Sequence, residues 1–262
     1  MLRTRLRTAL IALPAVLAIV LFAPAVVFKA FIFVLALWGL REIAEMIHAT
    51  AGETIAIAVA GGLPAIGAFR AMPPPAAWLG ALVVFALMLA LVVEVGANGP
   101  AGIPRGVFLA VVGAAWVGVL FPYFAQLRNN PGGVSAVILM LLLVVASDSG
   151  AYFAGRFAGK IKLLPNVSPN KTVEGAIGGL AACVVAAMVL RPFLTPGLTG
   201  AATVVLAIGI GVLAQLGDLA NSALKRVAGV KDSGWIFPGH GGLLDRTCSL
   251  AFATVLTYYC LR

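Results

Sequence analysis

The chain has 262 residues, of which 62% are hydrophobic and only 10% are charged. This composition excludes an ordinary soluble domain, because too few polar side chains remain to cover its surface. The formal net charge is +9, but the basic residues stand in short loops and lack interleaved aromatic residues, which excludes a nucleic-acid partner. Anionic membrane lipid is the partner that this charge favours.

Long apolar runs between the charged residues predict membrane-spanning helices. Four runs are long enough to cross a hydrocarbon core of about 30 Å, namely residues 71–93, 106–127, 129–147 and 192–217. Three shorter runs span it only if the helix is tilted, re-entrant or extended, namely residues 54–69, 175–190 and 247–261. Residues 8–40 carry one charge and predict two helices with a turn near Pro24. The predicted fold class is therefore all-α, a polytopic integral membrane helical bundle of about nine transmembrane helices.

The basic residues indicate how this bundle is oriented. If the N-terminus is cytoplasmic, 13 of the 18 Lys and Arg residues face the cytoplasm, as the positive-inside rule requires. The apolar stretch continues to residue 40, which favours an uncleaved first span over a signal peptide. We therefore predict that the N-terminus and both polar motifs face the cytoplasm.

The two halves of the chain differ in their acidic residues. All acidic residues in the segment 1–145 are glutamates. We predict that this segment forms a scaffold of transmembrane helices that could also carry dimer contacts. Among these glutamates, Glu42 and Glu45 follow the second span at helical spacing and are interpreted as part of a solvated helix end. Residues 146–262 hold every aspartate. They are predicted to form the catalytic region, since a carboxylate beside an apolar span indicates a functional site.

Residues 147–175 form the first of two predicted polar loops. Asp148 ends an apolar run, so we expect it at the cytoplasmic boundary of the membrane. Gly150, Gly155 and Gly159 would let the backbone come close to some other group, and the basic residues of the loop supply positive charge, a combination that suits phosphate. The loop is not a P-loop, because three residues separate Gly155 from the Gly-Lys pair where four are needed. A basic loop that only anchors the topology is the alternative.

A second polar segment covers residues 217–246. On a helix that begins near residue 217, the side chains of Asp218, Ser222 and Lys225 fall within about 60° of one another. A carboxylate, a hydroxyl and an ammonium group on one face suit a metal ion beside a phosphate. An internal ion pair between helices is the alternative.

A glycine-rich loop follows this helix. Gly241 and Gly242, together with Pro238 and two further glycines, shape a loop whose free amides could line an anion site. His240 stands between two glycines near the basic cluster. It is either a phosphate donor or a solvated loop histidine.

These residues resemble the signature of the phosphatidate cytidylyltransferases, also called CDP-diacylglycerol synthases. The resemblance rests on SALKR, KDSG, PGHGG and the pair Asp245-Arg246 in the second segment, and on GAYFAG and SPNKTVEG in the first. It implies an all-helical membrane enzyme, commonly a homodimer, that joins CTP to phosphatidate with Mg²⁺ and releases pyrophosphate. It also implies a set of substrate-binding residues, namely Ser168, Lys171, Thr172, Ser222, His240, Gly241 and Gly242.

One position departs from that signature. The family usually closes its motif with Asp-Arg-x-Asp, whereas Cys248 stands here three residues after Asp245. A thiol is a soft ligand that suits Mg²⁺ poorly, so an oxygen ligand is missing or comes from elsewhere. Reduced activity, a changed metal preference, an engineered substitution and an inert small cysteine all remain open.

The predicted roles follow from charge, because CTP and phosphatidate are polyanions that repel each other. Asp218 and Asp245 are predicted to hold Mg²⁺, with Asp148 or Asp232 as a further ligand and a second cation left open. The catalytic cations would neutralise the α-phosphate and the departing pyrophosphate, namely Lys225, Arg226, Lys231 and Arg246. A general base is not required, since a phosphate monoester is already largely ionised at neutral pH.

Two other functions fit part of the sequence. A CTP-dependent transferase or kinase could act on an isoprenoid lipid acceptor, and a non-catalytic transporter or scaffold could also place carboxylates among helices. A transporter predicts broken helices in both halves, whereas the polar residues here gather in one half. The enzyme interpretation predicts an integral protein of a bacterial inner membrane with a cytoplasmic active site.

Overall fold

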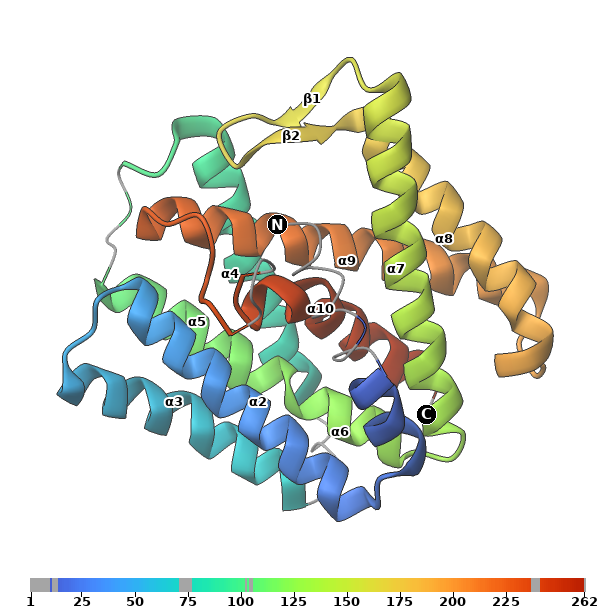
Figure 1. The fold of residues 1–262 in the computed structure, drawn as a ribbon, viewed down its shortest axis with the longest axis horizontal. Helices are drawn as coiled ribbons and strands as arrows, with labels where there is room; N and C mark the ends of the chain where they lie inside the picture. The colour runs from blue at the N-terminus through green and yellow to red at the C-terminus, as the bar shows by residue number, and fades with distance from the viewer. Residues whose placement is uncertain are drawn as a thin grey trace.

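The computed structural model describes Leu10 and residues 14–70, 77–101, 103, 106–236 and 241–261. A helical segment at residues 14–22 precedes the helices and the β-hairpin that are labelled in Figure 1. The first half contains α2 (Ala25–Met46), α3 (Ala51–Arg70), α4 (Ala77–Asn98), α5 (Gly106–Leu120) and α6 (Pro122–Asn129). The second half contains α7 (Gly133–Ala158), β1 (Lys162–Leu164), β2 (Ser168–Thr172), α8 (Val173–Leu194), α9 (Gly200–Ala228) and α10 (Leu244–Leu261).

Five helical segments of the described chain are long and apolar enough to cross a membrane, namely Trp78–Asn98, Phe108–Asn129, Gly133–Ala158, Val173–Leu194 and Gly200–Ala228. With the helices that surround them, they confirm an all-α integral membrane protein. The predicted span at residues 106–127 is divided between α5 and α6, because Pro122 has no backbone N–H to donate and starts a new helix. The nine spans and the cytoplasmic N-terminus stay predictions.

Helix α10 lies near the centre of the molecule, beside α9 (Figure 1). Its buried Phe252 contacts the ring of Phe85 from α4 at 5.0 Å and the ring of Trp116 from α5 at 6.2 Å, measured between ring centroids. In lipid, close packing of this kind holds helices together, because the bilayer itself is as apolar as their side chains. Helix α10 is thereby fixed against the first half of the chain as well as against α9.

Helices α7 and α8 pack closely through small residues. A methyl group at Gly150 would lie 2.5 Å from Cβ of Ala182 and 2.8 Å from the carbonyl oxygen of Gly178. Small residues at such positions let helix backbones approach each other in membranes. Gly150 thus lets the backbone of α7 come close to α8, as expected of a glycine here, and its role is in helix packing.

The prediction of one polar loop at residues 147–175 is also wrong. Helix α7 continues to Ala158, and a two-stranded hairpin follows it. The glycines in this stretch are tolerated in a helix because α8 packs against them. Asp148 consequently lies inside α7, well before its end, and not at a helix terminus.

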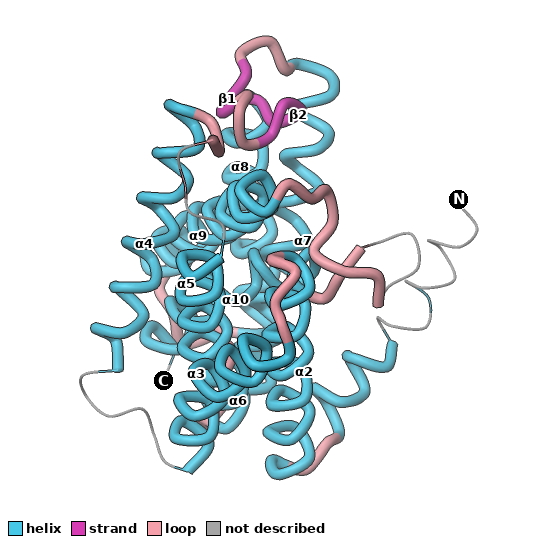
Figure 2. Tube along the Cα trace, turned by 90° about the vertical axis from the view of Figure 1, so that its left-hand side faces the viewer, coloured by secondary structure: helices cyan, strands magenta, loops and turns pink. Residues whose placement is uncertain are grey.

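The hairpin stands at one end of the bundle, above α8 (Figure 2). Strands β1 and β2 are antiparallel, and Lys162 lies opposite Thr172. The hydroxyl of Thr172 accepts a hydrogen bond from the N–H of Gly175 at 3.1 Å and so caps α8. This cap joins the hairpin to a membrane helix and fixes the direction in which β2 enters it.

Candidate active site

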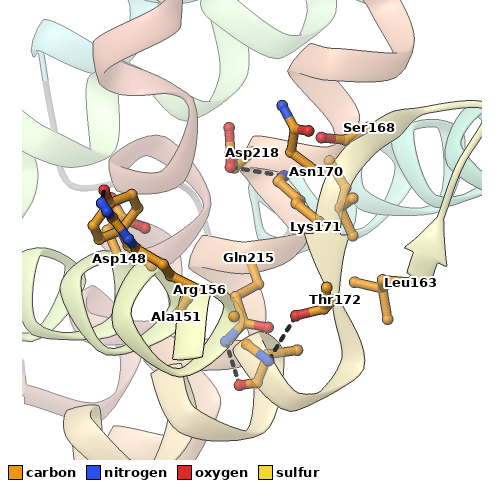
Figure 3. A pocket seen from close by; sticks show the side chains of 15 residues that line it. Asp148, Ala151, Arg156, Leu163, Ser168, Asn170, Lys171, Thr172, Gln215 and Asp218 are labelled. Atoms are coloured by element: carbon orange, nitrogen blue, oxygen red, sulfur yellow. Dashed lines mark hydrogen bonds and ion pairs between the residues drawn. The ribbon is translucent and has the colours of Figure 1, made fainter. Parts of the chain in front are cut away.

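A cavity of about 550 Å³ is lined by residues of the β-hairpin and of α7, α8 and α9. This volume is within the range of small-molecule sites. It gathers several predicted site residues, namely Asp148 from α7, Ser168, Lys171 and Thr172 from β2, and Asp218 from α9 (Figure 3). The two polar segments of the sequence therefore meet in one place.

Lys171 and Asp218 form an ion pair in this cavity. Nζ of Lys171 lies 2.7 Å from Oδ2 of Asp218, and the two side chains are 27% and 44% exposed. The pair lacks the angles of a hydrogen bond, so Nζ has no hydrogen-bond partner among the described residues. Nζ itself is buried, so the ammonium group needs a counter-charge, which Asp218 supplies here. An anionic ligand that reached Nζ could take over this role.

Asp148 lies on the α7 wall of the same cavity, where the charges of Asp218, Lys171 and Arg246 act on it. Two carboxylates from different helices thus share one space with an ammonium group. Like charges at close range repel each other, so a bound cation would relieve the repulsion between Asp148 and Asp218.

The cavity also contains two amides that the sequence interpretation missed. Asn170 and Gln215 line it, and Nε2 of Gln215 donates to the carbonyl oxygen of Ala176 at 3.0 Å. Asn170 stood inside the SPNKTVEG segment and could have been included with its neighbours. Gln215 was detectable only as the one amide of the apolar run at residues 192–217.

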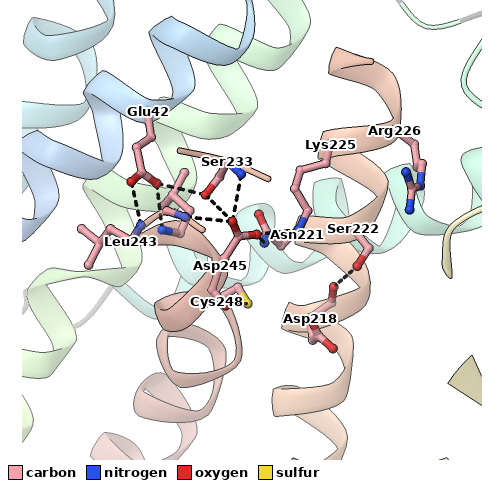
Figure 4. Close-up of polar contacts among 12 residues, drawn as sticks. Glu42, Asp218, Asn221, Ser222, Lys225, Arg226, Ser233, Leu243, Asp245 and Cys248 are labelled. Atoms are coloured by element: carbon pink, nitrogen blue, oxygen red, sulfur yellow. Dashed lines mark hydrogen bonds and ion pairs between the residues drawn. The ribbon is translucent and has the colours of Figure 1, made fainter. Parts of the chain in front are cut away.

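Asp245 belongs to a second cluster, which is closed (Figure 4). Its Oδ1 accepts hydrogen bonds from Nζ of Lys225 at 2.5 Å and from Nδ2 of Asn221 at 3.0 Å. Its Oδ2 accepts from the N–H and hydroxyl of Ser233 at 2.9 and 3.0 Å and from the N–H of Gly242 at 3.1 Å. The side chain is only 6% exposed. Both oxygens are therefore already engaged by donors of the protein itself.

The surroundings of Asp245 favour its ionised form. Burial acts to raise its pKa, but Lys225 and the N–H groups of Ser233 and Gly242 act in the other direction, and the resulting pKa lies below the ordinary value. Asp245 thus remains the anion around which this cluster is organised. A metal ion bound to Asp245 would have to displace these donors, and its role as a ligand stays a prediction.

Glu42 joins the same cluster from the first half of the chain. It is 1% exposed, its Oε1 accepts from the N–H of Leu243 at 2.6 Å, and its Oε2 accepts from the N–H of Leu244 at 2.9 Å. The hydroxyl of Ser233 lies 3.0 Å from both Oε2 of Glu42 and Oδ2 of Asp245, so the two carboxylates share its one proton. N–H groups at the start of a helix have no partner within it, so this carboxylate satisfies them and interacts favourably with the dipole of α10. The interpretation of Glu42 as part of a solvated helix end is wrong, because α2 buries this turn against the start of α10.

Gly242, in the described end of the glycine loop, lies against the protein's own carboxylates. The N–H of Gly242 is bonded to Asp245, and a methyl group at Gly242 would lie 2.5 Å from Oε2 of Glu42. The prediction that this amide is free for an external anion is therefore wrong. Gly241 has a φ of +83°, a conformation that favours glycine. His240 lies outside the described residues, and its role as a phosphate donor stays a prediction.

The predicted polar face of α9 divides between the two clusters. Asp218 faces the cavity and Lys225 is paired with Asp245, about 10 Å further along the helix. The hydroxyl of Ser222 donates to the backbone carbonyl of Asp218 at 2.8 Å. Nε of Arg226 donates to the carbonyl of Val167 at 3.2 Å and thereby ties the end of α9 to the hairpin.

The remaining predicted residues lie at the edges of these clusters. Lys231 and Asp232 are exposed on the loop after α9. Arg246 lines a different, apolar cavity, although its charge acts on Asp148. These three residues therefore do not line the cavity that holds Lys171.

The cavity fits a magnesium ion that arrives with a phosphate ligand. The described residues contain no group of three or more His, Cys, Asp and Glu side chains that could hold a metal alone. Mg²⁺ is commonly held by one or two carboxylates together with substrate phosphates, and Asp148 and Asp218 supply such a pair. Cys248 is 2% exposed, and its backbone packs against α9 at Gly217. Its thiol adds no hard ligand.

Fold and cavity together define a polytopic membrane protein with a site suited to phosphate compounds at one end of its bundle. The chain belongs to the cytidylyltransferase family, whose model matches residues 3–262. It is 34% identical to the phosphatidate cytidylyltransferase of Bacillus subtilis over 149 residues, which cover 56% of this chain and 55% of that relative. It is 35% identical to the phosphatidate cytidylyltransferase of Synechocystis sp. over 136 residues, which cover 52% and 46%. The chain thus spans about half the length of the curated relatives it matches.

Proposed function

We propose that this chain transfers the cytidylyl group of CTP to phosphatidate, giving CDP-diacylglycerol and pyrophosphate for phospholipid synthesis. The observation that carries the proposal is the cavity that Lys171 shares with Asp148 and Asp218. An ammonium group with unused donors beside two carboxylates suits a polyanion that arrives with a divalent cation. The activity named for the similar proteins of Bacillus subtilis and Synechocystis supports the choice of substrates.

The residues of the cavity would divide the work by charge. Lys171 donates to a phosphate oxygen of CTP and holds the nucleotide in place. Asp148 and Asp218 hold Mg²⁺, which when bound neutralises charge on the phosphates. An oxygen of the phosphatidate phosphate attacks the α-phosphorus in line, and the new P–O bond forms as the bond to the β-phosphate breaks and pyrophosphate leaves. Arg226 keeps the hairpin, and with it Lys171, beside α9.

The same proposal includes a cavity on the cytoplasmic side of a bacterial inner membrane, in contact with anionic lipid, in a homodimer. The excess of basic residues on the predicted cytoplasmic side supports this orientation. CTP would then enter from the cytosol and phosphatidate from the bilayer.

Incubation of the purified protein with cytidine-labelled CTP, phosphatidate and Mg²⁺ tests the proposal. We expect label in the lipid phase with phosphatidate and none with an isoprenoid phosphate. Asp218→Asn should lower turnover by roughly 10²–10³-fold, the usual loss when a group that stabilises the transition state is removed. Glu53→Gln, an exposed change on α3, is the control and should keep full turnover. Full turnover by a correctly inserted Asp218→Asn protein, or transfer to the isoprenoid acceptor alone, would contradict the proposal.

A further inference from the structure

Gln215 is a polar residue within α9, a helix that is long and apolar enough to cross a membrane. Polar side chains in such helices are costly and often functional, although some of them only join helices. Gln215 does join two helices, since its Nε2 donates to the carbonyl oxygen of Ala176 on α8 at 3.0 Å (Figure 3). Gly179 makes room for this group, because a methyl group there would lie 2.9 Å from Nε2. The nitrogen of the amide is therefore held in place against α8.

The oxygen of the same amide is not used by the protein. Gln215 lines the cavity that holds Lys171 and Asp218. Its Oε1 accepts no hydrogen bond within the described part of the chain, and it is not enclosed. A backbone carbonyl can only accept, so the amide cannot turn over without placing its oxygen against that of Ala176. Gln215 therefore offers the cavity a hydrogen-bond acceptor whose position is fixed.

Asn170 on β2 is the second amide of the cavity, and it differs from Gln215 in this respect. It is exposed, and its side chain forms no hydrogen bond with the described residues. Its amide can turn over and offer either a donor or an acceptor at the same point. Asn170 can therefore bind a polar ligand, but it cannot distinguish a ligand that donates from one that accepts.

The neighbours of Gln215 suit a nucleotide base. Asp218 lies three residues further along α9, about 4.5 Å along its axis and about 60° around it, and Asp218 pairs with Lys171. The charged groups of that pair suit phosphates. Around the amide of Gln215 the neighbours are small and uncharged, since Ala151 and Gly179 both lie beside it. A flat, polar ring can approach the amide closely at this place.

We propose that Oε1 of Gln215 selects the base of the nucleotide by accepting a hydrogen bond from its exocyclic amine. The inference rests on the proposed function, which makes CTP the nucleotide in this cavity. Cytosine carries an amine where uracil carries a carbonyl oxygen. With uracil, two acceptors would face each other, and each would lose its hydrogen bond to water without replacement. Gln215 thereby favours CTP over UTP.

A CTP analogue in which hydrogen replaces the exocyclic amine, the triphosphate of pyrimidin-2-one riboside, isolates this hydrogen bond. For the wild-type protein, kcat/KM for the analogue and for UTP should be roughly 10–100-fold below that for CTP, the usual range for one contact that reads a base. This comparison needs no variant, so it tests the proposal even if a substituted protein fails to insert. Equal kcat/KM values for CTP and the analogue would overturn the proposal.

Gln215→Met assigns the selection to this residue. Methionine keeps the length of the side chain, but its thioether is only a weak acceptor. The variant should lower kcat/KM for CTP roughly 10–100-fold and leave that for the analogue unchanged, so the preference for CTP disappears. Asn170→Ala is the matched change in the other amide and should alter both constants by the same factor. A preserved preference in Gln215→Met, or a lost one in Asn170→Ala, would show that Gln215 does not select the base.

Nucleotide binding without the lipid acceptor separates this inference from the proposed function. Dissociation constants of CTP, UTP and the analogue are measured calorimetrically on the purified full chain, with Mg²⁺ and without phosphatidate. A preference for CTP that Gln215→Met abolishes, without any cytidylyl transfer on later addition of phosphatidate, would support base selection and contradict the proposed function. Cytidylyl transfer with equal affinities for CTP and the analogue would support the function and overturn base selection. A wild-type protein that binds none of the three nucleotides would contradict both.

Discussion

Asp218 lies on α9, and Asp245 pairs with Lys225 of the same helix, but the two aspartates have opposite surroundings. Asp218 is 44% exposed, and its side chain pairs with Lys171 at 2.7 Å. Asp245 is 6% exposed and accepts hydrogen bonds on both oxygens. A carboxylate that binds ligands must exchange its partners, whereas a carboxylate that holds a loop in place must keep them. We call Asp148, Lys171 and Asp218 the open cluster, and Glu42, Lys225, Ser233 and Asp245 the closed cluster. We expect the open cluster to control activity and the closed cluster to control stability.

Asp245→Ala should have the largest effect, and it should be on stability. Lys225 is 16% exposed and would remain buried without its partner, a change that typically costs about 3–5 kcal/mol. Thermal unfolding of the purified protein in detergent measures the loss. Asp218→Ala is the matched control and should cost less, because the Asp218 side chain is 44% exposed and pairs with Lys171 alone, whereas Asp245 is 6% exposed and accepts hydrogen bonds on both oxygens. Equal losses in the two variants would remove the distinction between the clusters.

Lys171→Ala should show the opposite pattern. If Lys171 holds a phosphate of CTP, its loss should lower kcat/KM for CTP by roughly 10²–10³-fold, or about 2.7–4 kcal/mol. The free energy of unfolding should change by no more than about 1 kcal/mol, because the side chain loses its ion pair with Asp218 but no hydrogen bond among the described residues. Lys162→Ala, an exposed change in β1 of the same hairpin, should keep kcat/KM. Equal rates in both lysine variants would show that a general basic surface, and not Lys171, attracts the nucleotide.

Glu42→Gln tests whether the closed cluster depends on the first half of the chain. An amide keeps the shape but directs an NH₂ group at a backbone N–H of α10, so one buried donor loses its acceptor at a cost of about 1–3 kcal/mol. Glu45→Gln lies on the same helix, where Glu45 forms an exposed pair with Arg41 at 2.8 Å, and should cost at most about 1 kcal/mol. Unfolding midpoints of the two variants, compared at one detergent concentration, decide the matter. Indistinguishable midpoints would show that Glu42 is dispensable for the start of α10.

The open cluster could be predicted from the sequence more completely than the closed one. Asp148 and Asp218 are charged residues beside long apolar runs, and Lys171 stands in the polar SPNKTVEG segment, so each could be singled out before its neighbours in space were known. The helical membrane fold was predictable for a related reason, since a backbone in lipid must satisfy its polar groups within helices.

The closed cluster could not be predicted, because it depends on packing between distant segments. Glu42 and Leu243 are 201 residues apart in the sequence, and only the position of α2 against α10 brings them together. The length of α7 could not be predicted for the same reason. In the sequence Gly150 is typical of a loop, and only the packing of α8 against it explains its place in a helix. Local patterns indicate which residues carry charge, but they do not show which backbone donors a buried carboxylate will meet.

Cys248→Asp should have the smallest effect and the most specific one. The thiol is 2% exposed and lies near enough to Asp218 for the charge of that carboxylate to act on it. A carboxylate at this position would add a hard oxygen ligand beside Asp218. If Mg²⁺ binds there, the concentration for half-maximal activity should fall roughly fivefold, or about 1 kcal/mol. The measurement is a magnesium titration of cytidylyl transfer.

Cys248→Ser is the control for this last change, because its hydroxyl is small and neutral and should leave the magnesium requirement unchanged. Burial of the new carboxylate should also lower the stability of the Cys248→Asp protein in the absence of metal, and added Mg²⁺ should restore it, since a ligand that binds only the folded state stabilises it. An unchanged magnesium requirement in a folded Cys248→Asp protein would mean that the ion lies away from α10. Asp148 and the substrate phosphates would then be the remaining partners of Asp218.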